Sequence, residues 1–216
     1  TSRLREANAD LLKALVKAIE TRDPYTSGHS LRVAYLARQI AEALGLPSAG
    51  VEQIEQAALL HDIGKIESAY SAILLKPAGL TAEERAIIQS HVTKGEALLR
   101  KMSSLPEALI LAVRHHHEKE DGTGYPDGLA GEQIPLGARI IGVCDAVDAM
   151  LSDRPYRSAL SVPAVMEQLR RNVGTQFCPA VVDALIGADL IAEYADIMGA
   201  SRETGALEVA LSVVRP

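Results

Sequence analysis

The sequence predicts an all-α protein, a compact bundle of about seven to nine helices, from three observations. Aromatic residues are rare, with one Phe, six Tyr and no Trp, so Leu, Ile, Val and Ala must fill the core, and these side chains favour packed helices. Apolar residues recur at helical spacing along much of the 216-residue chain. Turn-forming residues separate these stretches, and the length suits one core with one active centre.

Composition and charge exclude several classes of function. The formal net charge is −6 and the pI is near 5.5, which argues against polymeric nucleic acid as a partner but permits a small basic pocket. Cys144 and Cys178 lack CxxC spacing, so neither a disulfide framework nor a thiolate zinc site is predicted. No apolar run approaches the roughly 18 residues that span a bilayer. We therefore expect a cytoplasmic protein without membrane insertion.

The apolar pattern divides the chain into three parts. Residues 1–22 are predicted to form an amphipathic linker helix, which Asp23-Pro24 breaks. Residues 23–187 form the main domain, and residues 188–216, with weaker helical patterns, form a C-terminal helical extension. Because the chain opens with Thr1 instead of Met, we expect an upstream regulatory domain. The linker helix is also the expected contact in a homodimer.

The first half of the main domain contains three predicted helices. Gly45 ends an apolar stripe over residues 33–44. A second stripe over residues 54–61 runs directly into a polar pair at its end. Thr81 and Glu84 form a capping box for a third helix.

The second half contains further helices and one loop rich in glycine. Ser104 and Glu107 form a second predicted capping box, for a helix that ends in a run of histidines. The apolar pattern resumes after Pro135, and Ser161 is expected to cap the helix that follows. The intervening segment, residues 121–134, is predicted to be an ordered turn between two helices.

All six histidines lie in four short segments, and several fall where an apolar helix face should continue inward. A single buried histidine is more often a hydrogen-bonded core residue than a ligand. Several imidazoles that converge on one interior are costly to bury unless they share something that satisfies them, such as metal ions. The histidines are His29, His61, His91, His115, His116 and His117.

The pair His61-Asp62 is placed at the last turn of a predicted helix, where an imidazole and a carboxylate can approach one ion or bridge two. The dipeptide alone is weak evidence. Its context is stronger, because Gly64 can relieve the chain after the helix and Lys65 places an ammonium one turn beyond the pair.

These motifs resemble, in their order and approximate spacing, those of the HD-GYP family of metal-dependent phosphohydrolases. The resemblance covers roughly residues 20–187 and is highly specific. The segments that carry it are Gly28-His29-Ser30, Leu60-His61-Asp62-Ile63-Gly64-Lys65-Ile66, His91-Val92-Thr93-Lys94-Gly95, His116-His117-Glu118, Asp121-Gly122-Thr123-Gly124-Tyr125-Pro126-Asp127-Gly128-Leu129 and Asp145-Ala146-Val147-Asp148-Ala149-Met150.

The resemblance implies a centre that holds two divalent first-row metal ions. Nitrogen and oxygen ligands without thiolate suit iron or manganese, and zinc fits as well. Asp62 matches a carboxylate that bridges two ions, and the implied reaction is attack by a metal-activated hydroxide. The implied ligands are His29, His61, Asp62, His91, His116, His117 and Asp145.

The resemblance also implies residues that bind substrate. Lys65 matches a lysine that touches the scissile phosphate, whereas a surface lysine is the alternative. Arg154 and Arg157 match a pair that holds a guanine edge or a phosphate, and a surface ion-pair turn is the alternative. Tyr125 is predicted to contact the ligand, or else to belong only to a rigid turn.

Several positions depart from the family pattern. Residues 67–71 replace a shorter Gly-Ile-Pro-like stretch, which puts the contact of that loop with ligand in doubt. Cys178 stands where Asp is usual, and is read as a structural substitution outside the metal set. His115 is expected to support the ligands or lie exposed. Tyr25 replaces a Glu that some members use for a third metal, so a two-metal centre is predicted.

The predicted activity is that of a phosphodiesterase that hydrolyses cyclic di-GMP to linear pGpG, and further cleavage to GMP stays open. Two alternatives stay open. An HD-type hydrolase could act on another cyclic dinucleotide or nucleotide with the same centre. A sensor could bind cyclic di-GMP and signal through the linker helix with little turnover, and product analysis separates this sensor from an enzyme.

Overall fold

The structure is a computed structural model that describes residues 28–66, 79–153 and 157–204, together with Ala14, Val16, Glu20 and residue 73. Within these residues the fold is all helical, with two isolated β-bridges and no strand, which confirms the predicted class. The helices are α2 (His29–Ala43), α3 (Ser48–Leu60), η1 (Ile63–Ile66), α5 (Ala82–Gln89), α6 (His91–Leu99), α7 (Glu107–His115), η2 (Gly131–Gln133), α8 (Leu136–Leu151), α9 (Val162–Arg171), α10 (Pro179–Gly187) and α11 (Leu190–Thr204).

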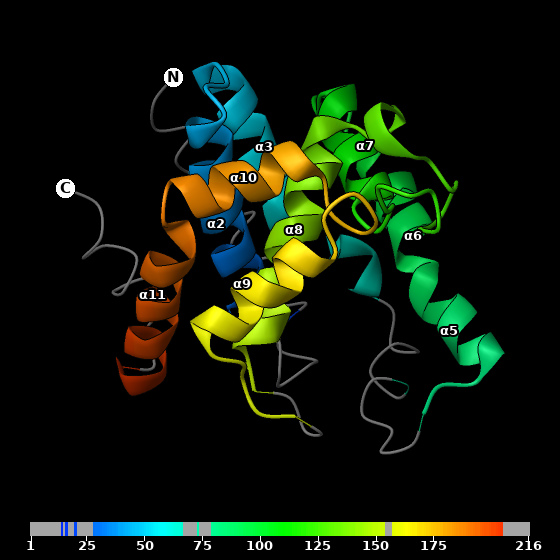
Figure 1. Ribbon diagram of the computed structural model, residues 1–216. Helices are drawn as coiled ribbons and strands as arrows, with labels where there is room; N and C mark the ends of the chain where they lie inside the picture. The colour runs from blue at the N-terminus through cyan, green and yellow to red at the C-terminus, as the bar shows by residue number, and fades with distance from the viewer. Residues whose placement is uncertain are drawn as a thin grey trace.

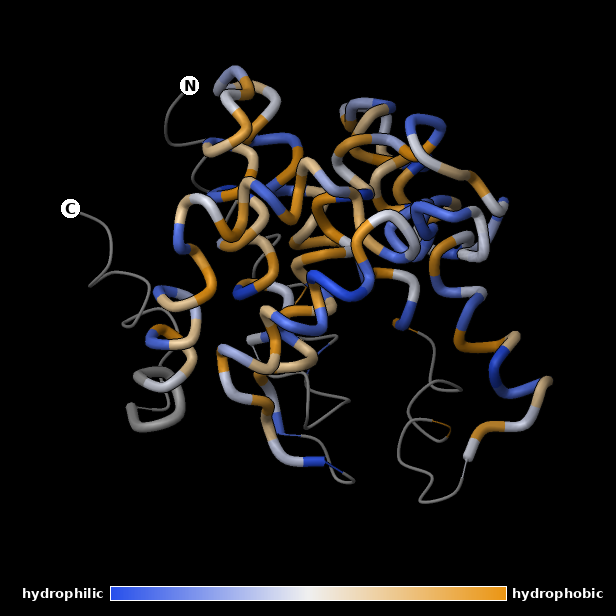
Figure 2. The backbone as a smooth tube through the Cα atoms, in the orientation of Figure 1, coloured by the Kyte–Doolittle hydropathy of each residue, from blue (hydrophilic) through white to orange (hydrophobic). Residues whose placement is uncertain are grey.

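Helix α8 runs through the middle of the bundle and packs against α2, α3, α7, α9 and α10 (Figure 1). Its side chains Ile140, Ile141 and Val147 are fully buried, as expected of a helix that is surrounded by others. The outer helices α5 and α11 instead alternate hydrophobic and hydrophilic positions (Figure 2). One apolar core therefore supports the polar residues that α8 carries.

The observed helix ends can be compared with the capping residues that the sequence predicted. Gly45 has φ 73° just after α2, as predicted. The Thr81 capping box is present, because the Thr81 hydroxyl accepts from the Glu84 N–H and the Thr81 N–H donates to the Glu84 carboxylate. The capping box predicted at Ser104 is wrong. Helix α7 begins at Glu107 with Pro106 as its N-cap and no side-chain cap, since a residue that precedes proline disfavours the helical conformation.

The two ends of the chain are described only in part. Ala14, Val16 and Glu20 of the predicted linker helix are helical, and the rest of that helix lies outside the described residues. Helix α11 supplies the predicted helical structure after residue 187, and its Tyr194 is fully buried in the core. Every helix that the structure describes is too short or too polar to cross a membrane.

Gly64 has a role that differs from the predicted one. It does not adopt a left-handed conformation after α3 but lies within η1, where the backbone of α6 approaches closely. A Cβ at this position would lie 2.0 Å from the carbonyl oxygen of His91. The missing side chain therefore sets the spacing between the segment that carries Asp62 and the helix that begins at His91.

Replacing Gly64 with alanine is expected to destabilise the protein by several kcal/mol, because backbone atoms must shift to admit the methyl group. The shift should also displace His91 and lower metal content. Gly187→Ala is the matched control, since nothing lies within 4 Å of its Cβ position and alanine favours the helix. Urea unfolding of the two variants checks this expectation, and equal stabilities would contradict it.

Candidate metal centre

The seven predicted ligands come from the ends of four helices and from α8, and the structure brings them together. His29 is the first residue of α2 and His91 the first of α6. His61 and His116 cap the C-termini of α3 and α7, so Asp62 and His117 directly follow helix ends. Helix ends converge here because α2, α3 and α7 pack against α8, and α6 packs against α7 and η1.

Three imidazoles are oriented in the same way by the helix that precedes each of them. The Nδ1 atoms of His61, His91 and His116 lie 2.7 Å from the carbonyl oxygens three residues earlier, those of Ala58, Ile88 and Val113. A carbonyl only accepts, so each Nδ1 must carry the proton. Each Nε2 therefore presents its lone pair to the interior.

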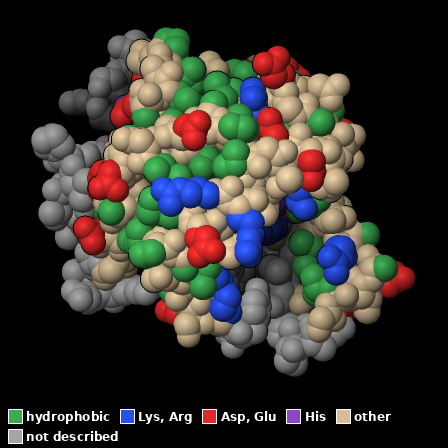
Figure 3. Space-filling model, viewed as in Figure 1, with side chains coloured by type: hydrophobic (Ala, Val, Ile, Leu, Met, Phe, Trp, Pro, Cys, Tyr) green, Lys and Arg blue, Asp and Glu red, His purple; other side chains and the backbone are tan. Residues whose placement is uncertain are grey.

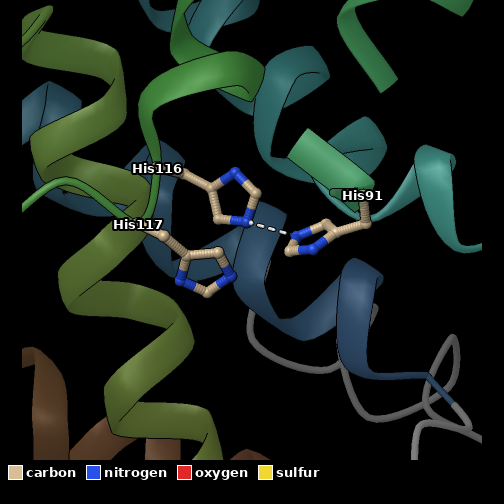
Figure 4. Close-up of side chains that lie close together, drawn as sticks. All are labelled: His91, His116 and His117. Carbon is tan, nitrogen blue, oxygen red and sulfur yellow. Dashed lines mark hydrogen bonds between the residues drawn. The ribbon is translucent and has the colours of Figure 1, made fainter. Parts of the chain in front are cut away.

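These lone pairs face one another. The Nε2 atoms of His91 and His116 are 3.3 Å apart, and the His117 ring lies beside both (Figure 4). Burial lowers the pKa of His91 to about 3 and that of His117 to about 4, and it holds the pKa of His116 well below its usual value. Neutral imidazoles with facing lone pairs repel unless a cation lies between them.

A second group forms around His29 and His61, whose Nε2 atoms are also 3.3 Å apart. Asp145 contributes an oxygen 3.4 Å from His29 Nε2. Burial lowers the pKa of His29, but the nearby carboxylates of Asp148 and Asp145 outweigh it and raise this pKa to about 10. This position therefore attracts positive charge.

Asp62 lies between the two groups. Its Oδ2 is 3.5 Å from His61 Nε2, and its Oδ1 is 3.4 Å from His91 Nε2. Burial raises the pKa of Asp62, yet the charges of Lys65 and the imidazoles bring it well below its usual value. Oδ1 is buried and has no hydrogen-bond partner among the described residues. An orphaned anionic oxygen among imidazole lone pairs fits a divalent cation.

Among the described residues, three groups have possible ligand atoms within 4.8 Å of one another; His115, Glu118 and Asp127 make one, and the predicted ligands make the other two sets. His29, His61 and Asp62 make the first, and His91, His116 and His117 make the second. The donor chemistry of both sets, with nitrogen and oxygen and no sulfur, suits first-row divalent ions.

Asp148 supports this centre and was missed by the sequence reasoning. It is buried on α8, one turn after Asp145, and its carboxylate accepts from His29 Nδ1 at 2.7 Å. The same carboxylate accepts from Arg32 Nε at 2.6 Å and from the Tyr194 hydroxyl at 2.6 Å. The available signal was the Asp145-x-x-Asp148 spacing, which places both acids on one helix face.

Of the remaining predicted residues, Tyr125 and Lys65 contact candidate ligands. Tyr125 stacks on His117, with ring centroids 4.9 Å apart and planes at 28°. Lys65 Nζ donates to Asp62 Oδ2 at 2.7 Å, so the ammonium lies at the edge of the cluster. Arg157 donates to the Ala149 carbonyl at 2.7 Å. Arg154 and Tyr25 lie outside the described residues.

Two further residues bear on the loop that carries Tyr125. His115 lies outside the two ligand sets and is buried, so it is not exposed; its partner Asp127, at 2.9 Å, belongs to the loop and is not a predicted ligand. Glu118 accepts from the backbone N–H groups of residues 127, 128 and 129. These contacts hold residues 127–129 against the chain that follows His117.

A helical bundle whose helix ends converge on buried histidines and aspartates defines a class of metal-binding protein. The chain belongs to the HD domain family, whose model matches residues 13–181. This membership confirms the resemblance that the motifs indicated.

Named relatives agree with this assignment. The chain is 43% identical over 185 residues to the cyclic di-GMP phosphodiesterase response regulator RpfG of Xanthomonas campestris, covering 85% of this chain and 48% of that protein. It is 39% identical over 175 residues to 3′3′-cGAMP-specific phosphodiesterase 3 of Vibrio cholerae, covering 81% and 38%. The chain thus spans about half or less of these relatives.

The fold also matches solved structures. A crystal structure of a cyclic GMP-AMP specific phosphodiesterase from V. cholerae superposes with a TM-score of 0.69. That match covers 95% of this chain and 52% of the other, at 18% sequence identity. At this identity the match supports the all-helical fold alone.

Proposed function

We propose that this chain is a metal-dependent phosphodiesterase that hydrolyses cyclic di-GMP to linear pGpG, with further cleavage to GMP left open. The observation that carries the proposal is the position of Asp62 between two sets of imidazoles, with one oxygen directed toward each set. Relatives named for cyclic di-GMP hydrolysis support this substrate. Catalysis is assigned to Asp62 and Lys65.

The residues of the chain prepare the site for a phosphodiester. Backbone carbonyls fix the tautomers of His61, His91 and His116, so their Nε2 atoms are ready to bind ions without reorganisation. Two divalent ions, iron or manganese, would supply Lewis-acid activation of water and of the phosphoryl oxygens. Lys65 lies where its ammonium can neutralise charge that grows on phosphorus oxygens.

Recognition of the nucleotide is assigned to the surroundings of the centre. Tyr125, stacked on His117, offers an aromatic edge beside the metal ligands. Arg154 and Arg157 are proposed to hold a guanine edge or a phosphate. On the face shown in Figure 3, Lys and Arg side chains are scattered among acidic ones, which suits a small ligand better than polymeric nucleic acid.

A related activity has its own support. Several relatives are named as 3′3′-cGAMP-specific phosphodiesterases, so a cyclic dinucleotide with one adenine is the second candidate substrate. The upstream regulatory domain, the homodimer through the linker helix and the cytoplasmic location stay predictions.

Product analysis tests the proposal. The chain is loaded anaerobically with iron or manganese and incubated separately with cyclic di-GMP and 3′3′-cGAMP, and the products are separated by chromatography. We expect pGpG from cyclic di-GMP, and the same separation shows whether GMP follows. Binding without turnover would favour the sensor. Turnover of 3′3′-cGAMP alone would make it the substrate in place of cyclic di-GMP.

We predict two metal ions per chain. Seven candidate ligands exceed the three or four protein groups that one site normally uses. Tyr25 offers a neutral phenol, with a reference pKa of about 10, where a third ion would need a carboxylate. Elemental analysis and an anomalous-scattering map of metal-loaded crystals check this, and either one peak or three full peaks would contradict it.

Lys65→Ala is expected to lower kcat about a hundredfold or more with little change in KM, because its charge acts mainly in the transition state. Arg154→Ala and Arg157→Ala should instead raise KM first. Lys101→Ala, an exposed lysine, is the matched control. Metal content is measured in each variant, because Lys65 also contacts Asp62. Kinetics in the reverse order would show that the catalytic and recognition roles are exchanged.

A further inference from the structure

A cavity of about 240 Å³ adjoins the metal centre on the side of the loop after His117. His117 and Asp145, both candidate ligands, form one part of its wall, and Tyr125 and Phe177 form aromatic parts. Liquid water takes about 30 Å³ per molecule. The cavity is therefore large enough for several waters or for a planar base.

Two opposite charges face this cavity, and each has a buried atom without a partner. Arg139 projects from α8, and its Nε is buried with no hydrogen-bond partner among the described residues. Glu120 lines the cavity from the loop, and its Oε2 is buried and equally unpartnered. No ion pair joins these two side chains within the described part of the chain.

Among the described residues, the one hydrogen bond of the Arg139 side chain is weak. Its Nη1 donates to the Cys178 sulfur at 3.6 Å, and a thiol is a poor acceptor. Cys178 is the N-cap of α10, and its side chain makes no hydrogen bond to cap that helix. The sequence thus places an uncharged residue beside a guanidinium that has no carboxylate partner among the described residues.

Buried donors and acceptors without partners are costly, so an occupant that pairs with both side chains would offset this cost. Arginine pairs with two acceptors on one edge of a ligand, and glutamate accepts from donors. Guanine offers this combination, because O6 and N7 accept while N1–H and the N2 amino group donate. Adenine presents an amino group in place of O6 and an acceptor at N1, so it opposes both side chains.

We propose that Arg139 and Glu120 form a guanine-selective subsite beside the metal centre. Arg139 reads the O6 and N7 acceptors, and Glu120 reads the N1–H and N2 donors. Tyr125 and Phe177 contribute aromatic surface next to the base. The inference rests on the proposed function for the kind of ligand, a guanine nucleotide, and it adds the residues that choose between purines.

Binding of GMP and AMP tests the subsite without requiring turnover. Calorimetry with the full metal-loaded chain gives the two Kd values, and their ratio cancels the contribution of the phosphate. We expect GMP to bind at least about tenfold more tightly than AMP, the scale of one bidentate base contact. Equal affinities would overturn the inference even if cyclic di-GMP is hydrolysed.

Two substitutions remove the proposed contacts. Glu120→Gln keeps the size of the side chain but replaces one acceptor by a donor. Arg139→Met removes the guanidinium group. Both are expected to bring the ratio of the two Kd values close to one. Glu132→Gln is the matched control, because this exposed acid lies on η2 outside the cavity wall. A guanine preference that survives both changes would contradict the assignment.

A third variant adds a partner instead of removing one. Cys178→Asp places a carboxylate beside Arg139 Nη1, where it should capture the guanidinium and lower the guanine preference about tenfold. Aspartate also suits the N-cap of α10, so the thermal midpoint should not fall. A lower preference for GMP over AMP, measured as the ratio of their Kd values, supports the subsite if the thermal midpoint of unfolding is unchanged or higher. Unchanged ratios with shifted midpoints in all three variants would mean that the charges serve stability only.

Failure of the proposed function gives a different result. If the chain hydrolyses bis(p-nitrophenyl) phosphate but no cyclic dinucleotide, the metal centre works and the substrate is wrong. The GMP and AMP affinities still decide whether the cavity selects guanine.

Discussion

Replacement of Asp62 by alanine is expected to reduce bound metal to one ion or less per chain and to lower kcat by about a hundredfold to a thousandfold, the scale for loss of one group of a preorganised site. The reason is the position of Asp62 between two sets of imidazoles, with one oxygen near each set. No other described carboxylate places one oxygen near each set of imidazoles. The Asp145 oxygen lies near His29, which belongs to the first set. Loss of Asp62 should therefore weaken both sets at once.

The measurement is elemental analysis after reconstitution, together with the rate of pGpG formation. Asp183→Ala provides the matched control, because this exposed acid lies on α10 away from the ligand sets. Unfolding curves for both variants separate a lost ligand from a lost fold. Two ions and a full rate in Asp62→Ala would remove Asp62 from the centre.

Replacement of Asp148 by alanine is expected to lower the free energy of unfolding by about 3–5 kcal/mol, because it breaks a buried ion pair from one side. Arg32 would keep its charge in a buried position after losing two hydrogen bonds to this carboxylate. His29 would lose the acceptor that orients its ring, so metal affinity should also fall by about 10-fold to 100-fold.

Denaturant unfolding and metal titration measure the two effects of Asp148→Ala. Tyr194→Phe is the graded control, because it removes only the hydroxyl that donates to Asp148 and should cost about 1 kcal/mol. It should leave the orientation of His29, and therefore metal affinity, close to that of the wild type. If Asp148→Ala and Tyr194→Phe have equal free energies of unfolding, the carboxylate contributes no more to stability than the single hydrogen bond from Tyr194.

Local spacing predicted that several histidines point inward, and the resemblance to the HD-GYP family supplied the rest of the candidate ligand set. Apolar stripes at helical spacing ran into histidines, and each stripe predicted that its histidine points inward. The structure places His61 and His116 at the C-caps of α3 and α7, as those stripes implied. Spacing along a helix depends on neighbouring residues only, so it can be read from sequence.

Helix boundaries were less predictable where two local signals competed. Ser104 and Glu107 have the spacing of a capping box, but Pro106 lies between them and excludes the helical conformation before it. The start of α7 follows the proline. Thr81 has no such competitor, and its capping box formed.

Other features were decided by tertiary structure, because they depend on residues far apart in the chain. Asp148 forms hydrogen bonds with His29 and Tyr194, which lie 119 and 46 residues away in the sequence. Gly64 must lack a side chain only because α6 passes beside it. Glu120 and Arg139 become notable only where the fold buries both at one cavity. By itself the sequence determined the helical class and the inward-facing histidines, which follow from local spacing, and the family, which its motifs indicated. The packing of the helices alone decided which distant side chains support the centre, because pairing and burial are properties of the folded chain.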